Sequence, residues 1–395
     1  MAHNTGKPVG KTLVIALIVT LTSSVFAAVL AIISLTDIPT SDGNRETFWE
    51  TRLLECSNGA SKKGSDGQIA GECVADALYA ALTDGSIKQF GTAATEVTAK
   101  DPWLNSTCHE PTHGLGPRIL EHYEEDWRRA LLEATWDFCD SGALHGLYDL
   151  WGEKQHSAQD WLRLAHLCQE SMAVRVNGCP DAVGHAAYES LEQDPAAAMG
   201  ICALIETRTY ARDCAMGVVM QHYNPNNPAL VRQRGNQIPG PSRWPMIFQL
   251  CELATSGAKV TEAVRTGCVA GAGWMMGVFI SEQSDGYQSD MERFNGRRTE
   301  LIHKALDHCV STGGEQATEC TNMLFRRPPL NVTSSSAKVL EFCRQSTEGR
   351  SENGLRITCL ANALPRMSNS ERTALIEQEP SVREVANQVG LGFKI

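Results

Sequence analysis

Apolar residues recur at three- and four-residue steps along most of this chain, as they do on one face of a helix. The clearest stretch covers residues 116–136, where charged residues fill the other face and the apolar face consists of Leu120, Tyr123, Trp127, Leu131 and Ala134. Similar patterns follow Asp160, Cys202, Val260, Arg298 and Ala337. No stretch alternates apolar and polar residues in the way a half-buried strand does. The pattern predicts an all-α fold, with residues 116–136 as one amphipathic helix.

The most apolar part of the chain is residues 13–35, 23 residues without a charge. At about 1.5 Å per residue a helix of this length crosses a hydrocarbon core of roughly 30 Å. Lys7 and Lys11 precede it and acidic residues follow, so the positive-inside rule places residues 1–12 in the cytoplasm. The segment is predicted to be a transmembrane signal-anchor helix of a single-pass membrane protein, with a periplasmic or extracellular C-terminal region. The alternative is a signal peptide cleaved after Ala27, although such peptides have apolar regions of only about 7–15 residues.

The cysteines support an external location. All 14 follow the apolar segment and form seven successive pairs, most of them close: Cys56 with Cys73, Cys108 with Cys139, Cys168 with Cys179, Cys202 with Cys214, Cys251 with Cys268, Cys309 with Cys320 and Cys343 with Cys359. An even count with no Cys-x-x-Cys is typical of disulfides formed outside the reducing cytosol. We interpret each pair as one cysteine near the end of a helix and a partner near the start of the next, so that the bridge clamps the connecting turn.

The second cysteine of each pair also reveals a repeat. Six residues after it stands a large side chain, namely Tyr79, His145, His185, Met220 or Trp274. Steps of 34 residues from Cys168 to Cys202 and 35 from Cys179 to Cys214 match the two-helix unit of an α-solenoid. This arrangement resembles the disulfide-stapled, Sel1-like and tetratricopeptide-like helical-repeat proteins found outside the cytoplasm. The resemblance is clearest between Cys168 and Tyr223.

A proline- and asparagine-rich stretch, residues 223–245, interrupts the repeats. It is predicted to link N-terminal Cys- and His-containing repeats, residues 45–222, to C-terminal repeats and terminal helices, residues 246–395. The net charge of −11 argues against a nucleic-acid partner. Because solenoids present an extended concave surface, the first functional hypothesis is a protein-binding or scaffold module.

One motif suggests catalysis. His109-Glu110-Pro111-Thr112-His113 matches His-Glu-x-x-His, in which two histidines bind zinc and the glutamate acts as general base. Three features oppose a zincin. Cys108, directly before the motif, is predicted to be tied into a disulfide. Pro111 belongs in the first turn of a helix, which would leave His109 outside that helix. Ile119 stands where metzincins have a third histidine. Whether the chain is an enzyme stays open.

A broader histidine site does not depend on that motif. His113 stands five residues after Cys108, and His145 and His185 stand six after Cys139 and Cys179. If the repeats stack in register, these side chains share one face with His109, with His222 next along. Imidazoles that converge could bind zinc or copper, with Glu110 as general base. The alternative is simple packing, because other repeats carry Tyr, Met or Trp at the same position. Convergence of the histidines is the observation that separates the two hypotheses.

Overall fold

The computed structural model describes the greater part of the chain after residue 41: residues 42–58, 66–100, 104, 108–134, 138–154, 156–172, 178–223, 240–257, 259–285, 291–326, 336–348, 353–364, 367 and 369–388. Within these residues every regular element is a helix and there is no strand, which confirms the all-α prediction. The predicted cytoplasmic tail, residues 1–12, and the predicted membrane anchor, residues 13–35, lie outside the described residues.

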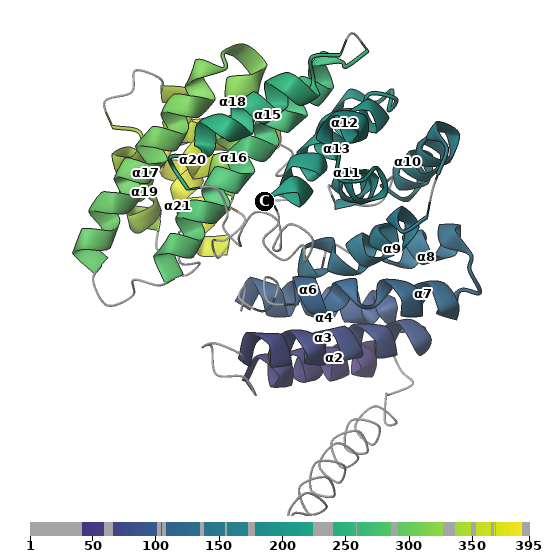
Figure 1. Cartoon of the computed structure of the whole chain (residues 1–395). Coiled ribbons are helices and arrows are strands. Elements are labelled where there is room, and N and C mark those ends of the chain that lie inside the picture. The colour runs from purple at the N-terminus through teal and green to yellow at the C-terminus, as the bar shows by residue number, and fades with distance from the viewer. Residues whose placement is uncertain are drawn as a thin grey trace, which may run out of the picture.

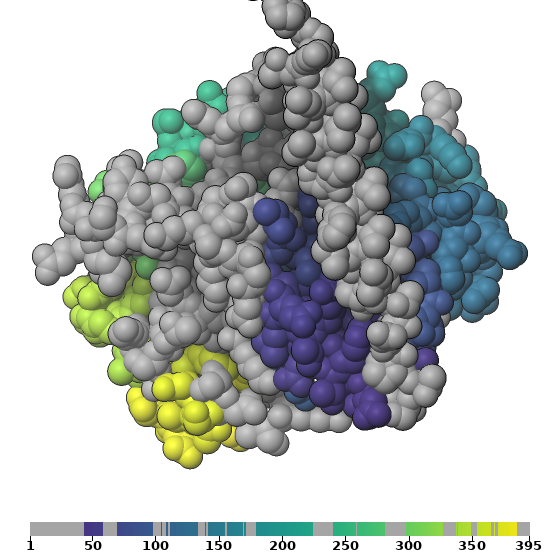
Figure 2. Space-filling view, turned by 90° about the horizontal axis from the view of Figure 1, so that it is seen from below, coloured from purple at the N-terminus to yellow at the C-terminus, as the bar shows by residue number. Residues whose placement is uncertain are grey.

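A curved row of helices forms the centre of the molecule (Figure 1), and each member packs against the next. We call it the central row. It consists, in order, of α3 (Asp66–Thr83), α6 (His109–His113) with α7 (Gly116–His122), α9 (Gly142–Gly152), α11 (Gly178–Ser190), α13 (Arg208–His222), α16 (Glu262–Asp285), α18 (Gly314–Arg326) and α20 (Asn353–Ala363). When the molecule is turned to be seen from below, both ends of the described chain, purple and yellow, lie on the same face (Figure 2).

The remaining helices pack beside members of the central row and bury their apolar faces against it. These flanking helices are α2 (Asp42–Asn58), α4 (Ile87–Lys100), α8 (Trp127–Ala134), α10 (Ala158–Met172), α12 (Pro195–Cys202), α15 (Trp244–Ala254), α17 (Met291–Ser311) and α19 (Ser336–Ser346). The last described elements are α21 (Asn369–Gln378) and α22 (Ser381–Gln388), and a short 3-10 helix, η1 (Phe138–Ser141), precedes α9.

All seven predicted disulfides are formed, and no cysteine is free. Cys108 and Cys139 join the residue before α6 to η1, across a sequence separation of 31. This full set of bridges indicates an oxidising location outside the cytoplasm. The other six join a flanking helix to the neighbouring member of the central row: Cys56 to Cys73, Cys168 to Cys179, Cys202 to Cys214, Cys251 to Cys268, Cys309 to Cys320 and Cys343 to Cys359.

Most of these bridges lie deeper in the second helix than predicted. Cys179 stands in the first turn of α11, but Cys73, Cys268 and Cys359 stand about two turns after the start of α3, α16 and α20. Their Cα atoms lie 5.6, 5.6 and 5.7 Å from those of their partners, within the range that a disulfide needs. The prediction that every bridge clamps a turn is therefore wrong, because these bridges join helices that already run side by side. Cysteine spacing therefore predicts which cysteines pair, but it does not predict where each helix starts.

Residues 116–136 are not the single amphipathic helix that their periodicity predicted. The chain forms α7 and α8 instead, and between them Glu124 and Glu125 have φ angles of 53° and 65°. Asp126 then opens α8, because its Oδ1 accepts hydrogen bonds from the backbone N–H groups of Arg128 and Arg129. The break leaves the apolar periodicity intact, so periodicity alone could not reveal it.

Helices of the central row approach each other closely at glycines. A Cβ on Gly273 would lie 2.2 Å from the carbonyl oxygen of Cys320, and one on Gly217 would lie 2.0 Å from that of Asp181. In the glycine-rich stretch 271–277, Gly273 and Gly277 face α18 and Gly271 faces α13, so contact between helices explains these glycines. Glycine lets two helix backbones touch, and any larger residue would push them apart.

Among the described residues, one helical stretch, Glu262–Ile280, is long and apolar enough to cross a membrane, but 83% of it is buried within the protein. It belongs to α16, in the middle of the central row. Most of the predicted linker, residues 223–245, lies outside the described residues, and α15 begins at Trp244. On either side of that stretch α13 packs against α16, and α12 against α15.

Candidate metal centre

His109 and His113 lie on one short helix. α6 begins at His109, so Pro111 falls in its first turn, where a proline needs no backbone N–H donor. The prediction that Pro111 would leave His109 outside the helix is wrong, since the two histidines are separated by one helical turn. Cys108 caps this helix, and Thr112 Oγ1 donates a hydrogen bond to the Cys108 carbonyl at 2.8 Å.

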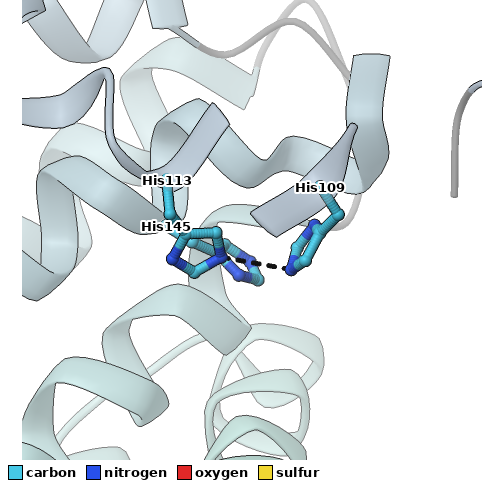
Figure 3. Close-up of side chains that lie close together, drawn as sticks. All are labelled: His109, His113 and His145. Carbon is cyan, nitrogen blue, oxygen red and sulfur yellow. Dashed lines mark hydrogen bonds between the residues drawn. The ribbon is translucent and has the colours of Figure 1, made fainter. Parts of the chain in front are cut away.

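His145 reaches the same place from α9. Two glycines on α9 let its backbone lie directly against α6. A Cβ on Gly146 would lie 1.9 Å from the His113 carbonyl oxygen, and a Cβ on Gly142 would lie 2.3 Å from the His109 carbonyl oxygen, so neither position has room for a side chain. The imidazole rings meet edge to face, with the His145 centroid 5.2 Å from that of His109 and 5.4 Å from that of His113. The three side chains point toward one another from α6 and α9 (Figure 3). Each offers one nitrogen within 4.8 Å of the others, and we call them the histidine trio.

The outer partners of the trio determine which nitrogens carry protons. His109 Nδ1 lies 2.9 Å from the Cys139 carbonyl oxygen, which can only accept, so Nδ1 carries the hydrogen. His113 Nδ1 lies 2.8 Å from Asp149 Oδ2 and donates to it. Burial raises the pKa of Asp149, but the hydrogen bond and charge of His113 lower it by more, so its pKa lies below the ordinary value. In neutral His109 and His113 the lone pair is therefore on Nε2.

These two Nε2 atoms lie 3.1 Å apart, the contact drawn as a dashed line in Figure 3. Two lone pairs repel at that distance, so the contact requires a cation between them, either a proton on one ring or a bound metal ion. Tetrahedral zinc with Zn–N bonds of about 2.0–2.1 Å separates two ligand nitrogens by about 3.3 Å. The spacing therefore suits a metal, and the outer carboxylate and carbonyl are the partners that metal-binding histidines require.

The members of the trio differ in burial. His109 and His113 are half-buried, whereas His145 is buried. The Asp149 side chain is 40% exposed, so the trio lies nearer to solvent on the side of His113 and Asp149. The opposite side, behind His145, faces the core of the central row.

Behind His145 lie two more polar side chains, both from α11. The His185 ring centroid is 4.9 Å from that of His145, and Asp181 Oδ1 is 3.6 Å from His145 Nε2. Burial raises the pKa of Asp181 to about 6 and lowers the pKa of His185 to about 3. The structure thus gathers four histidines and two aspartates from α6, α9 and α11.

The predicted site residues have different outcomes. His109, His113, His145 and His185 lie together, as stacking in register predicted, and metal binding by them stays a prediction. Glu110 belongs to α6, but its side chain lies outside the described part. His222 does not join them, because its Nδ1 pairs with the Tyr188 hydroxyl at 2.9 Å, the packing role that was the alternative.

Sequence reasoning missed Asp149 and Asp181. The signal was there: Asp149 stands four residues after His145, and Asp181 four before His185, one helical turn in each case. In the structure Asp149 on α9 faces His113 on α6, and Asp181 on α11 faces His145 on α9. Only the stacking of helices in the central row reveals these pairs.

The disulfide next to the trio helps to position His109. Cys139 has a φ angle of 57°, a left-handed conformation that costs a non-glycine residue about 1–2 kcal/mol. Its bond to Cys108 keeps the Cys139 carbonyl against the start of α6, where His109 donates to it. This bridge therefore fixes the ring orientation of His109.

The double substitution Cys108→Ser with Cys139→Ser keeps the carbonyl of residue 139 but no longer ties it to the start of α6. We expect metal binding to weaken about 10-fold, the lower end of the loss that follows when an outer partner of a ligand is removed outright. Cys343→Ser with Cys359→Ser, at the far end of the row, is the matched control. Each change removes about 2–4 kcal/mol of stability, but the control should keep its metal affinity. Competition titration of the folded proteins measures both, and equal affinities would show that the Cys108–Cys139 bridge plays no part in the site.

Comparison with protein-family models, with curated proteins and with solved structures found no match for this chain.

Proposed function

We propose that this protein binds a zinc or copper ion outside the cytoplasm through His109, His113 and His145. The observation that supports this proposal best is the 3.1 Å contact between the Nε2 atoms of His109 and His113. Both rings are oriented by acceptors at Nδ1, as in metal sites where a carboxylate or carbonyl fixes the tautomer. A packing role predicts histidines buried separately in their own repeats, and the convergence of three rings from two helices argues against it.

Three protein ligands leave one position of a tetrahedral ion for water or substrate. That is the arrangement of catalytic zinc sites, whereas structural sites use four protein ligands. A bound ion would act there as a Lewis acid and lower the pKa of its water, and Glu110 remains the predicted general base. Hydrolysis is therefore the reaction class we assign to the site.

The setting of this centre is part of the same proposal. Residues 13–35 would anchor the chain in a membrane, with the helical hairpins outside it stacked as a solenoid. A solenoid surface favours a protein partner, so the scaffold hypothesis stays a prediction beside metal binding. The two are compatible, because the trio occupies only the α6 and α9 part of the central row.

Cobalt is the direct probe of this proposal, because four-coordinate Co²⁺ absorbs visible light far more strongly than the hexaaqua ion. The full chain, produced in an oxidising compartment and freed of metal by a chelator, is titrated with Co²⁺. We expect an intense visible band that Zn²⁺ removes. The exposed His166 on α10 supplies the control variant His166→Ala, which should keep the band. Folded, helical wild-type protein that develops no band would rule the proposal out.

A further inference from the structure

The side of the centre that faces the core holds polar atoms that the trio does not use. His145, Asp181 and His185 are 3%, 7% and 6% exposed. They come from α9 and α11, which pack directly against each other. On the other side of α11 the backbone of α13 closes the space, since a Cβ on Gly217 would lie 2.0 Å from the Asp181 carbonyl oxygen.

Two of these buried atoms have no hydrogen-bond partner among the described residues, His185 Nε2 and Asp181 Oδ1. The 3.6 Å between Asp181 Oδ1 and His145 Nε2 is too long for a hydrogen bond. Buried polar atoms are satisfied in the great majority of native structures, and exceptions indicate an ion, a water molecule or a functional role. Here an imidazole nitrogen and a carboxylate oxygen, both metal-ligand atoms, belong to side chains that each lie against the buried His145 ring.

We propose that Asp181 and His185 bind a second divalent metal ion, on the inner side of His145. The proposal rests on the function assigned above, because His109, His113 and His145 hold the outer ion. A carboxylate with imidazoles is a donor set that suits Zn²⁺, Mn²⁺ or Fe²⁺. His145 lies between the two positions.

Zinc stoichiometry tests this proposal. Full-length protein is stripped of metal, dialysed to equilibrium against Zn²⁺ alone and analysed for zinc per chain. Wild type should hold two ions, and His185→Gln and Asp181→Asn should each hold one. The double variant His109→Ala/His113→Ala should also hold one, in the inner position. The exposed control His166→Gln should keep both.

The outcomes separate the two proposals. One ion in the wild type, kept by Asp181→Asn and lost in His109→Ala/His113→Ala, would overturn the inner site and leave the outer one standing; a buried water would then satisfy Asp181 and His185. Two ions that persist in both inner variants would also overturn it. No bound zinc in folded wild type would defeat both proposals. Anomalous diffraction at the zinc edge from wild-type crystals answers the same question without any variant. Two adjacent peaks would support the inner site, and a single peak would contradict it.

Discussion

Replacing His113 and His145 together with alanine is expected to lower zinc affinity by about three orders of magnitude or more. A zinc ion bound by protein ligands gains about 10–16 kcal/mol in small zinc-binding domains, so each ligand contributes several kcal/mol. The double variant would leave His109 as the sole member of the trio. His113 is also oriented by its hydrogen bond to Asp149, so the variant removes a ring that is held in place for binding. Isothermal titration with Zn²⁺ measures the change.

The matched control for this variant is His166→Ala/His303→Ala, which removes two imidazoles from other parts of the fold, on α10 and α17. It should bind zinc like the wild type. Circular dichroism is needed beside the titration, because alanine at the buried His145 leaves a cavity. A well-folded double variant that keeps wild-type zinc affinity would contradict the site.

The second large effect concerns the glycine at the contact of α6 and α9. Gly146→Ala places a Cβ 1.9 Å from the His113 carbonyl oxygen, a distance that forces the two helices apart. Overpacking of this kind costs about 1–3 kcal/mol or more. The same displacement moves His145 away from His109 and His113, so we expect Gly146→Ala to lose both thermal stability and zinc affinity.

Two other glycines make this prediction specific. Gly273→Ala creates a comparable clash, 2.2 Å from the Cys320 carbonyl oxygen, but between α16 and α18. The Gly273→Ala protein should be less stable than the wild type and should still bind zinc. Gly200 lies within α12 with nothing near its Cβ position, so Gly200→Ala should gain about 0.5–1 kcal/mol. Thermal melts and zinc titrations of the three variants test this order, and a Gly146→Ala protein as stable as wild type would refute the close contact.

The framework of this fold was largely predictable because covalent spacing determines it. The short separation within most cysteine pairs predicted every disulfide, and a bridge between neighbouring helices fixes their register. Counting from Cys108, Cys139 and Cys179 then predicted that His113, His145 and His185 would lie on one face if the repeats stack in register. These inferences needed only the spacing of the cysteines and histidines and the assumption that the repeats stack in register.

The helix break at residues 124–125 and the aspartate–histidine pairs depend on contacts that no clear sequence pattern indicates. Left-handed residues at Glu124 and Glu125 split one amphipathic pattern into two helices, and neither is a glycine. Asp149 and Asp181 pair with histidines of the preceding helix, so their roles emerge only when helices stack. Gly142 and Gly146, four residues apart, are the sequence feature that brings α9 against α6, and they stand directly around His145.

Metal content of the purified protein is the most direct test of the central claim. The full chain, produced in an oxidising compartment and never exposed to a chelator, is analysed by inductively coupled plasma mass spectrometry. At least one equivalent of zinc or copper per chain, lost in His113→Ala/His145→Ala, is the predicted result. Folded protein with all seven disulfides that contains no metal, and takes up none from added zinc or copper, would contradict it.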